Sequence, residues 1–197
     1  MKIGMIDIET APSTAHVWGI WQQNVSLKQL LESSYTMCFA WKWYKERGIE
    51  YKSIHRDGEL DMLQRAWQLL DECDAVIHYF GSRFDIPTIQ KEFLLQGMGP
   101  PSPFKQIDLL TTVRKQFKFP SNKLEYLAST LGVGSKVKHE GHELWLKCMA
   151  GDEKAWKMME KYNKQDVALL EKVYNKLLPW INNHPNHGLY MDSDKPV

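Results

Sequence analysis

The sequence predicts an α/β fold, in which a mixed sheet flanked by helices forms a single domain. Strand-like segments come first and helical patterns later, which favours this class. A chain of 197 residues is long enough for one sizeable core, and 43% hydrophobic with 25% charged residues is typical of a globular protein. We expect the domain to span residues 1–180, followed by a polar tail or linker at 181–197.

The predicted strands lie in the first half of the chain. Residues 2–8 are apolar on both faces, which is typical of a strand in the middle of a sheet. Residues 36–44 and 49–55 are two further strand candidates, and the turn-like residues 46–48 between them indicate an antiparallel hairpin. A short fourth strand is expected at residues 75–79.

The predicted helices are marked by apolar spacing and by signals at their ends. Apolar residues recur at helical spacing over residues 60–70, with Asp57 as the candidate N-cap. Ile86-Pro87 opens a second helix, because Pro is well tolerated in a first turn. Further helices are expected at residues 108–117, at 124–131, and from 152 towards Pro179.

Cysteine content and hydropathy bear on the compartment. Cys38, Cys73 and Cys148 are widely spaced and form no C-x-x-C pair, which favours reduced thiols in an intracellular protein. The N-terminus lacks the pattern of a signal peptide, and no window approaches the roughly 18 apolar residues of a membrane helix. We expect a soluble protein of the cytoplasm, or of the host cytoplasm if the chain is phage-encoded.

Two acids interrupt the first predicted strand. The segment MIDIET, residues 5–10, places Asp7 and Glu9 among apolar residues. Side chains alternate across a strand, so both carboxylates share one face. An unpaired buried carboxylate is costly, and Mg²⁺ or Mn²⁺ would relieve this cost because these ions prefer oxygen ligands. The alternative is that both acids lie at an exposed end of the strand.

Two later segments carry further acids. Asp85, in FGSRFDIP, follows a strand and a glycine turn, where it either faces the edge of the sheet or caps a helix. Tyr162 and Asp166, in YNKQD, are four residues apart, so a helix places them on one face, one turn apart. Taken singly, a helix cap and an ordinary amphipathic helix are the favoured interpretations.

Taken together and in this order, the three segments resemble the motifs of the DEDD superfamily of 3′–5′ exonucleases, which have a ribonuclease H-like fold. The pattern D-x-E, F-D and Y-x-x-x-D is similar to that of the DEDDy subgroup, alongside the proofreading domains of many DNA polymerases. The resemblance extends from residue 1 to about residue 180. The chain is also similar to stand-alone exonuclease-like proteins of phages and bacteria in NKLEYLASTLGV and GDEKAWKMMEKYNKQDV.

One position departs from the family pattern. Many relatives carry H-N-G before the F-D pair, and the asparagine position falls on Phe80 in this chain. A hydrogen bond from that asparagine to the substrate is therefore not expected here, whereas the predicted metal ligands are unaffected.

The resemblance implies a two-metal mechanism with two Mg²⁺ or Mn²⁺ ions. Asp7 would bridge both ions, Glu9 and Asp166 would hold the ion on the side of the nucleophile, and Asp85 would hold the other. Such ions, about 3.5–4 Å apart, generate hydroxide and stabilise the charge of the transition state. A phenol has a pKa near 10, so Tyr162 would orient the attacking water rather than deprotonate it.

Basic and aromatic residues near the motifs are candidates for nucleic-acid contacts. Without the four predicted ligands, 20 acidic residues stand against 25 basic ones, and this excess of five positive charges suits a phosphate backbone. Lys136 and Lys138 are candidates for backbone contacts, although a solvated loop explains them equally well. Trp18, Trp21 and Phe80 are candidates for base stacking, although core packing is the commoner role of such side chains.

The sequence thus predicts a Mg²⁺-dependent 3′–5′ exonuclease acting on single-stranded ends, with DNA favoured over RNA. A polymerase or another replication or repair protein is a candidate partner. Two alternatives remain open: an exoribonuclease, and a nucleic-acid-binding module with a degenerate metal site. The intact set of four acids argues against a degenerate site.

Overall fold

A five-stranded mixed sheet forms the centre of the protein and confirms the predicted α/β fold. The computed structural model describes residues 1–182 and 184. The strands lie in the order β5-β4-β1-β6-β7, so β1 occupies the central position that its two apolar faces predict. These strands are β1 (Ile3–Thr10), β4 (Thr36–Trp43), β5 (Glu50–Ser53), β6 (Ala75–His78) and β7 (Lys105–Asp108).

The pairing of the strands leaves part of β1 uncovered. β1 runs antiparallel to β4, which forms the predicted antiparallel hairpin with β5. β1, β6 and β7 are parallel to one another. However, β6 pairs only with residues 3–5 of β1, so in the described part of the chain no strand covers the later residues of β1 on that side.

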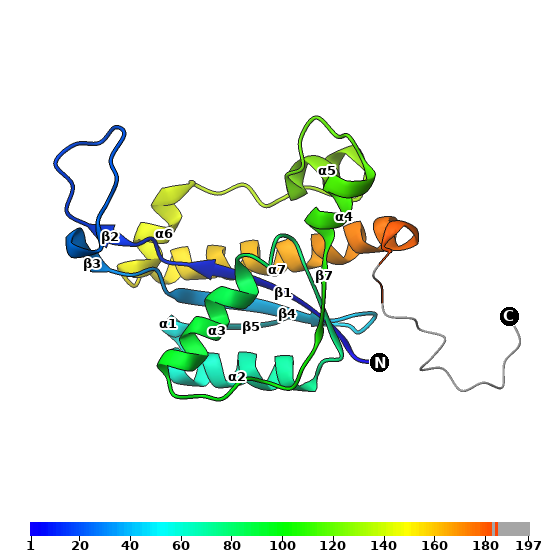
Figure 1. The fold of residues 1–197 in the computed structure, drawn as a ribbon, viewed down its shortest axis with the longest axis horizontal. Helices are drawn as coiled ribbons and strands as arrows, with labels where there is room; N and C mark the ends of the chain where they lie inside the picture. The colour runs from blue at the N-terminus through cyan, green and yellow to red at the C-terminus, as the bar shows by residue number, and fades with distance from the viewer. Residues whose placement is uncertain (183, 185–197) are drawn as a thin grey trace, which may run out of the picture.

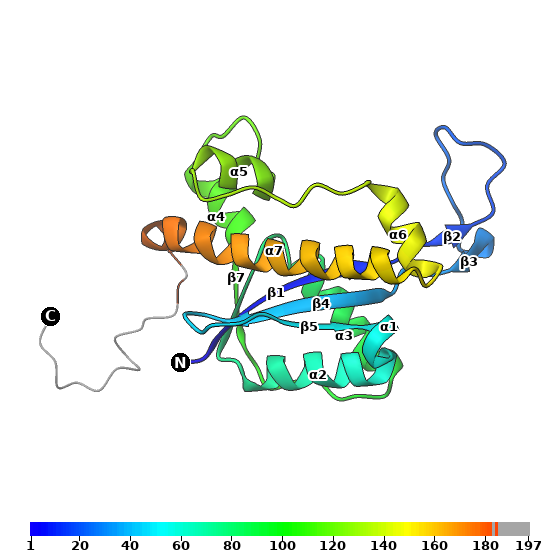
Figure 2. The same cartoon turned by 180° about the vertical axis from the view of Figure 1, so that it is seen from behind.

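Helices cover both faces of the sheet. α7 lies on one face together with α4, α5 and α6, and α2 and α3 lie on the other (Figure 1). Seen from behind, α7 extends along the sheet (Figure 2). The helices are α1 (Ile54–Asp57), α2 (Glu59–Glu72), α3 (Asp85–Leu95), α4 (Leu109–Gln116), α5 (Leu124–Thr130), α6 (His142–Met149) and α7 (Glu153–Leu177), with 3₁₀ turns η1 (Leu27–Gln29) and η2 (Leu178–Trp180).

Two details of the helices differ from the predictions. Asp57 is not the N-cap of α2, because Asp57 ends α1 and Gly58 occupies the cap position. The Asp57 carboxylate instead accepts a hydrogen bond from the Ser53 amide at 3.1 Å. The sequence also does not predict α6, since this helix buries only Leu144 and Cys148, too few residues for a helical repeat to stand out.

The alternation of β1 decides which helices its side chains meet. Ile3 and Met5 belong to the buried cluster between the sheet and α7, whereas Ile6 and Ile8 belong to the cluster between the sheet and α2 and α3. Odd-numbered side chains of β1 therefore face α7. This alternation places Asp7 on the face that α7 covers.

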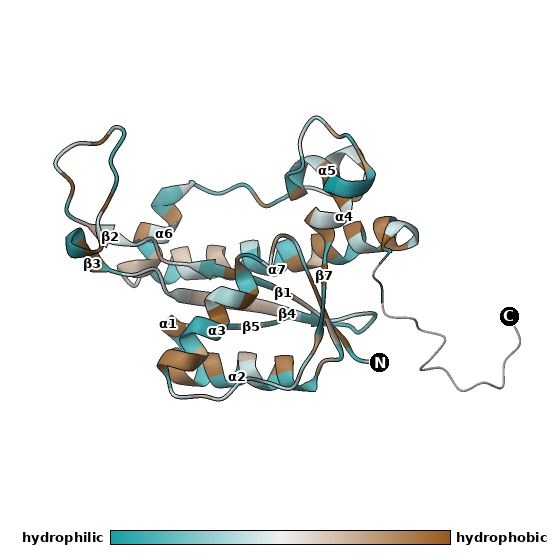
Figure 3. Ribbon diagram, viewed as in Figure 1, coloured by the Kyte–Doolittle hydropathy of each residue, from teal (hydrophilic) through white to brown (hydrophobic). Residues whose placement is uncertain are grey.

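A long loop, residues 16–29, protrudes between the short strands β2 (Thr14–Ala15) and β3 (Leu30–Glu32), which pair with each other. Trp18 is 98% exposed and Trp21 is 85% exposed. Hydrophobic stretches are visible along this β2–β3 loop (Figure 3). Core packing therefore does not explain these two tryptophans.

The predicted polar tail lies largely outside the described residues. Ile181 is buried against the cluster under α7, and the ring of His184 lies 2.5 Å from the Tyr174 hydroxyl. The boundary near residue 180 stays a prediction. Among the described helices, none has both the length and the apolar character that crossing a membrane requires.

Candidate active site

Three carboxylates from two elements converge beside the centre of the sheet. Asp7 and Glu9 of β1 and Asp166 of α7 each offer an oxygen, and these oxygens all lie within 4.8 Å of one another. β1 turns its two acids towards α7, and the buried residues of α7 around Val167 hold Asp166 against them. Asp166 is buried, and the other two are partly buried. The predicted strand and helix motifs thus meet in space.

Asp85 joins this group from the start of α3. Its Oδ1 accepts a hydrogen bond from the Ile8 amide at 3.1 Å. Ile8 lies in the half of β1 that β6 does not cover, so the carboxylate fills the open edge of the strand. Phe84 occupies the N-cap position of α3, so the alternative in which Asp85 caps the helix is wrong.

Burial raises the pKa of all four acids, and repulsion within the group raises the pKa of Asp7 and Glu9 further. Burial raises the pKa of Asp7 well above its usual value, and the charges of Glu9, Asp166 and Asp85 raise it further. Burial likewise raises the pKa of Glu9 to about 8 and that of Asp85 to about 7. The pKa of Asp166 is also raised, mainly by burial. Crowded carboxylates of this kind favour the protonated form unless a cation balances them.

Lys136 provides one positive charge within this group. Its Nζ contacts the Asp166 carboxylate and donates a hydrogen bond to the Tyr162 hydroxyl at 3.2 Å. Burial lowers the pKa of Lys136, but the charges of Asp166 and Asp7 raise it above its usual value. Lys136 therefore lies beside the acids as a counter-ion and not in a solvated loop. The sequence alone did not decide between these positions.

Tyr162 shares one helical face with Asp166, since both contact the Lys136 ammonium. Tyr162 is 8% exposed, and the His139 ring lies 4.6 Å from its ring. Burial and the Asp166 charge raise the pKa of Tyr162 above its usual value. The hydroxyl is therefore protonated at neutral pH, which suits it to orient a neighbouring group rather than to remove a proton.

Sequence reasoning missed Asn163. This fully buried side chain donates from Nδ2 to the Asp7 carboxylate at 2.7 Å and to the Asp7 carbonyl at 3.1 Å. Asn163 lies four residues before Val167 and seven before Leu170, both buried on α7. A polar residue at an apolar position of the helical stripe was the signal that could have indicated it.

The oxygen atoms of the group fit a hard divalent cation. Among the described residues, Asp166 Oδ1 and Asn163 Oδ1 are buried and have no hydrogen-bond partner. Buried acceptors without partners need an explanation, and a cation with its waters supplies one. The carboxylate oxygens of Asp7, Glu9 and Asp166 suit Mg²⁺ or Mn²⁺, which prefer such ligands.

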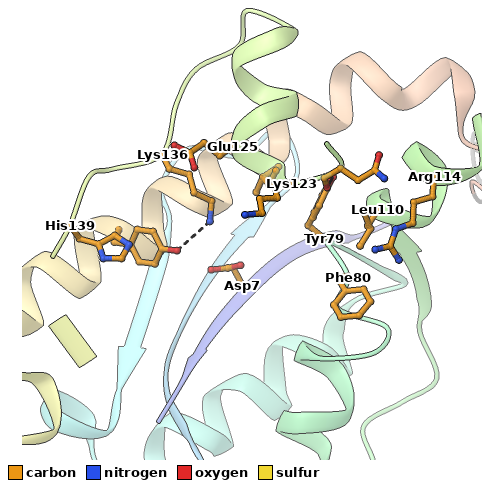
Figure 4. Close-up of a pocket in the computed structure, with 12 residues that line it drawn as sticks. Asp7, Tyr79, Phe80, Leu110, Arg114, Lys123, Glu125, Lys136 and His139 are labelled. Atoms are coloured by element: carbon orange, nitrogen blue, oxygen red, sulfur yellow. Dashed lines mark hydrogen bonds between the residues drawn. The ribbon is translucent and has the colours of Figure 1, made fainter. Parts of the chain in front are cut away.

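A cleft of about 690 Å³ opens beside the acids. Asp7 and Tyr162 line it together with Lys136, and Lys123 and Lys136 both extend towards Asp7 (Figure 4). Phe80 and other aromatic and basic residues line it further from Lys136. The cleft thus combines carboxylates, ammonium groups and a flat apolar ring, which suits an anionic ligand with aromatic groups.

The other predicted substrate contacts lie outside this cleft. Lys138 lines a second cleft of about 540 Å³ with Lys147 and Lys154, and His139 lines both clefts. Trp18 and Trp21 line neither of these two clefts and lie on the β2–β3 loop. The structure therefore gathers the predicted ligands in one place and leaves the predicted contacts distributed around it.

Comparisons with known proteins show the superfamily of the chain. A solved structure with a similar fold is that of the family B DNA polymerase from the hyperthermophilic archaeon Pyrobaculum calidifontis, with a TM-score of 0.67 and 16% identity. The similarity covers 90% of this chain but only 24% of the polymerase chain, and at 16% identity it shows the fold alone. No curated protein is significantly similar in sequence. The family description of the RNase H superfamily matches residues 6–178, and the chain belongs to that superfamily.

Proposed function

We propose that this chain is a metal-dependent 3′–5′ exonuclease that hydrolyses phosphodiester bonds at single-stranded 3′ ends, with DNA favoured over RNA. The observation that carries this proposal is the convergence of Asp7, Glu9, Asp85 and Asp166 from three separate segments beside a basic and aromatic cleft. Membership of the RNase H superfamily supports a nuclease. The order of the motifs, which resembles that of the DEDDy subgroup and of phage and bacterial relatives, supports the polarity.

The four acids fit two divalent cations, Mg²⁺ or Mn²⁺. Asp7, Glu9 and Asp166 would hold one cation, and Asp7 with Asp85 would hold the second. Bound cations would supply activation of water and charge stabilisation in the transition state. They would also neutralise the crowded carboxylates, which otherwise raise one another's pKa.

The remaining groups of the site would position the reactants. Tyr162 stays protonated, so its hydroxyl would orient the attacking water beside Asp166. Lys136 carries a stable positive charge next to Asp166, and it would pair with a phosphate oxygen of the substrate. Asn163 would hold Asp7 in place through its amide.

The β2–β3 loop and Lys138 would bind the rest of a single strand. Trp18 and Trp21 expose flat surfaces on which unpaired bases stack regardless of sequence. No acidic residue lies between Glu9 and Glu32 in the sequence, so this loop does not repel a phosphate chain. Lys138 is exposed beside two further lysines and would contact the backbone.

A polymerase or another replication or repair protein is the partner we propose. The support is limited to the fold, which resembles a part of a DNA polymerase. A nuclease that removes 3′ nucleotides acts on the same ends that a polymerase extends, so the two activities would meet on one substrate.

End-labelled oligonucleotides test the proposed function directly. Purified protein is incubated with single strands labelled at the 3′ or the 5′ end, in Mg²⁺ or in EDTA, with RNA and blunt duplex DNA in parallel. We expect early release of the 3′ label as a mononucleotide, a ladder of shortened 5′-labelled strands, and no reaction in EDTA. We also expect slower reaction of duplex DNA, because the cleft must receive a frayed end.

Other outcomes would contradict the proposal in distinct ways. Degradation from the 5′ end, or cleavage that persists in EDTA, would overturn the polarity or the metal dependence. Degradation of RNA alone would indicate an exoribonuclease. Binding without cleavage in Mg²⁺ and Mn²⁺ would indicate a non-catalytic module.

A further inference from the structure

We propose that Phe80 and Arg114 form a stacking site for one unpaired nucleobase of a single strand whose phosphate backbone runs past Lys123 towards Asp7. The inference rests on the proposed function for the class of ligand, and it adds the place where a base is held. Phe80, Arg114 and Lys123 line the same cleft as Asp7 (Figure 4). The base would thus be bound a short way along the cleft from the acids.

The backbone of Phe80 is held in an unfavourable conformation. Its φ is +71°, in the left-handed region that a bulky side chain rarely adopts. Phe80 is nevertheless 39% exposed as a residue, so burial in the core does not compensate for this conformation. Strain that persists without a packing gain is a feature of binding and catalytic sites, because it fixes the direction of a side chain.

Asp108 holds the strained turn in this shape. Its Oδ1 accepts a hydrogen bond from the Phe80 amide at 3.0 Å, and its Oδ2 accepts one from the Ser82 hydroxyl at 2.5 Å. Gly81 makes the turn tight, since a Cβ at this position would lie 2.4 Å from the His78 ring. Phe80 therefore points into the cleft because β6, β7 and the turn between β6 and α3 fix it there.

Arg114 completes the stacking site from α4. Its guanidinium carbon lies 5.9 Å from the centre of the Phe80 ring (Figure 4). Within residues 1–182 and His184, no carboxylate forms an ion pair with Arg114, so its charge is available to a ligand. A guanidinium plane and a phenyl ring both stack on bases, and the charge of Arg114 attracts a phosphate chain.

Lys123 connects this site to the acids. Its ammonium extends towards Asp7 from the residue before α5, between the position of Lys136 and that of Phe80 (Figure 4). No carboxylate pairs with Lys123 in the described part of the chain. Three cationic side chains therefore line the cleft from Phe80 to Asp7, which matches a backbone with one negative charge per nucleotide.

Phe80 occupies the asparagine position of the family pattern, and this difference agrees with a stacking site. Where related exonucleases carry an asparagine that can donate a hydrogen bond, a phenyl ring can only stack. We infer that in this chain stacking replaces that hydrogen bond. Binding at this position then depends on the presence of a base and not on which base it is.

Binding of strands that each lack one base, compared between the wild type and Phe80→Asn, tests the site without hydrolysis. Asn tolerates the left-handed conformation well, so this variant removes the ring while the turn keeps its shape. Binding is measured in EDTA by fluorescence anisotropy, with a 5′-labelled single strand in which one base at a time is removed. For the wild-type protein we expect one position near the 3′ end where removal of the base weakens binding about 10-fold.

Phe80→Asn should lose the abasic effect at that position alone, whatever hydrogen bond its new amide makes to the strand. Phe80→Trp should keep the abasic effect, and the melting temperature of Phe80→Asn should equal or exceed that of the wild type. Trp180→Ala removes an aromatic ring that is 51% exposed on η2 outside the cleft, and it should bind normally. Arg114→Ala should weaken binding of the intact strand, whereas Lys115→Ala, next to Arg114 but lining a different cavity, is its matched control and should bind normally.

An abasic effect that survives undiminished in Phe80→Asn, or the absence of any position at which removal of a base weakens binding to the wild-type protein, would overturn the stacking site. These results would leave end-labelled hydrolysis intact, so they would not touch the proposed function. Conversely, a protein that shows the abasic effect but never cleaves DNA would keep the stacking site and lose the nuclease.

Discussion

Asn163 Nδ2 donates a hydrogen bond to Asp7 Oδ2 at 2.7 Å, and this bond joins α7 to β1 across 156 residues of sequence. The same amide also holds the Asp7 carbonyl at 3.1 Å. Asp7 is thus oriented by a residue that sequence reasoning did not single out.

Asn163→Ala should therefore weaken Mg²⁺ binding and activity by about 10- to 100-fold, the usual cost of removing a group that orients a metal ligand. Isothermal titration with Mg²⁺ measures the affinity without substrate. Asn175 lies on the same helix as Asn163, and its amide oxygen accepts a hydrogen bond from the Tyr44 hydroxyl. Asn175→Ala is therefore the matched control and should bind Mg²⁺ normally. Normal Mg²⁺ affinity of Asn163→Ala would show that Asp7 needs no such support.

Removing the hydroxyl of Tyr162 should slow the reaction without emptying the metal centre. Tyr162→Phe should lower kcat by 10- to 100-fold, about 1.4–2.7 kcal/mol in barrier height, because the attacking water loses its orientation. Asp166→Ala should cost far more, because it removes a ligand. Single-turnover rates at saturating Mg²⁺ compare the two, with Tyr44→Phe as a control that removes an exposed hydroxyl. Equal losses of kcat in both variants, or no loss in Tyr162→Phe, would contradict these separate roles of Tyr162 and Asp166.

The metal-free protein should lose stability as the pH rises. Glu9 has a pKa of about 8 in the folded protein against 4.5 ordinarily, so the folded state binds its proton more tightly than the unfolded state. Stability is then full below about pH 4.5 for this group and falls until about pH 8. Asp85, with a pKa of about 7, acts in the same direction.

Thermal melts in EDTA between pH 5 and 9 test this dependence. Glu9→Gln should flatten the decline, since its amide does not titrate. In saturating Mg²⁺ the trend should reverse, because the cation needs deprotonated carboxylates. A metal-free melting temperature that climbs steadily over this range would contradict the raised pKa values.

Binding of single-stranded DNA to the β2–β3 loop should change the fluorescence of its tryptophans. Stacking of bases on Trp18 and Trp21 should quench fluorescence in EDTA, and the double variant Trp18→Ala/Trp21→Ala should lose most of the quenching. Its affinity should fall about 30-fold or more, given about 1–3 kcal/mol for each of the two stacked bases. Trp180→Ala should keep the signal. Normal DNA affinity of the double variant would contradict base stacking on the loop.

The central strand and its acids could be predicted from the sequence, because they depend on local patterns. Alternation in β1 places Asp7 and Glu9 on one face, and the four-residue spacing in α7 aligns Tyr162 with Asp166. The hairpin of β4 and β5 follows likewise from a turn between two β-type segments. Each of these features is determined within a few residues of the chain.

The rest of the site depends on tertiary contacts that no local pattern encodes. Lys136 reaches Asp166 from a loop 30 residues earlier, and its sequence neighbours equally suit a solvated loop. β7 contains Lys105 and Gln106, so its pairing with β6 outweighs a weak intrinsic preference. The strained turn at Phe80 depends on Asp108 of β7, which the sequence did not predict as part of a strand.

Asp7 is the proposed ligand of both cations, so its removal should affect activity more than any other change in the acid cluster. Asp7→Ala should retain the fold and remove nearly all nuclease activity. Its metal-free melting temperature should rise, because a buried carboxylate that repels Glu9, Asp166 and Asp85 is gone.

The most direct test is the rate at which Asp7→Ala degrades a 5′-labelled single strand in Mg²⁺, measured beside the wild type with both proteins shown to be folded by their melting curves. We predict less than about 1% of the wild-type rate, equivalent to a loss of more than about 2.7 kcal/mol in transition-state stabilisation. A folded Asp7→Ala that degrades the strand at close to the wild-type rate would contradict the metal-dependent active site proposed for this protein.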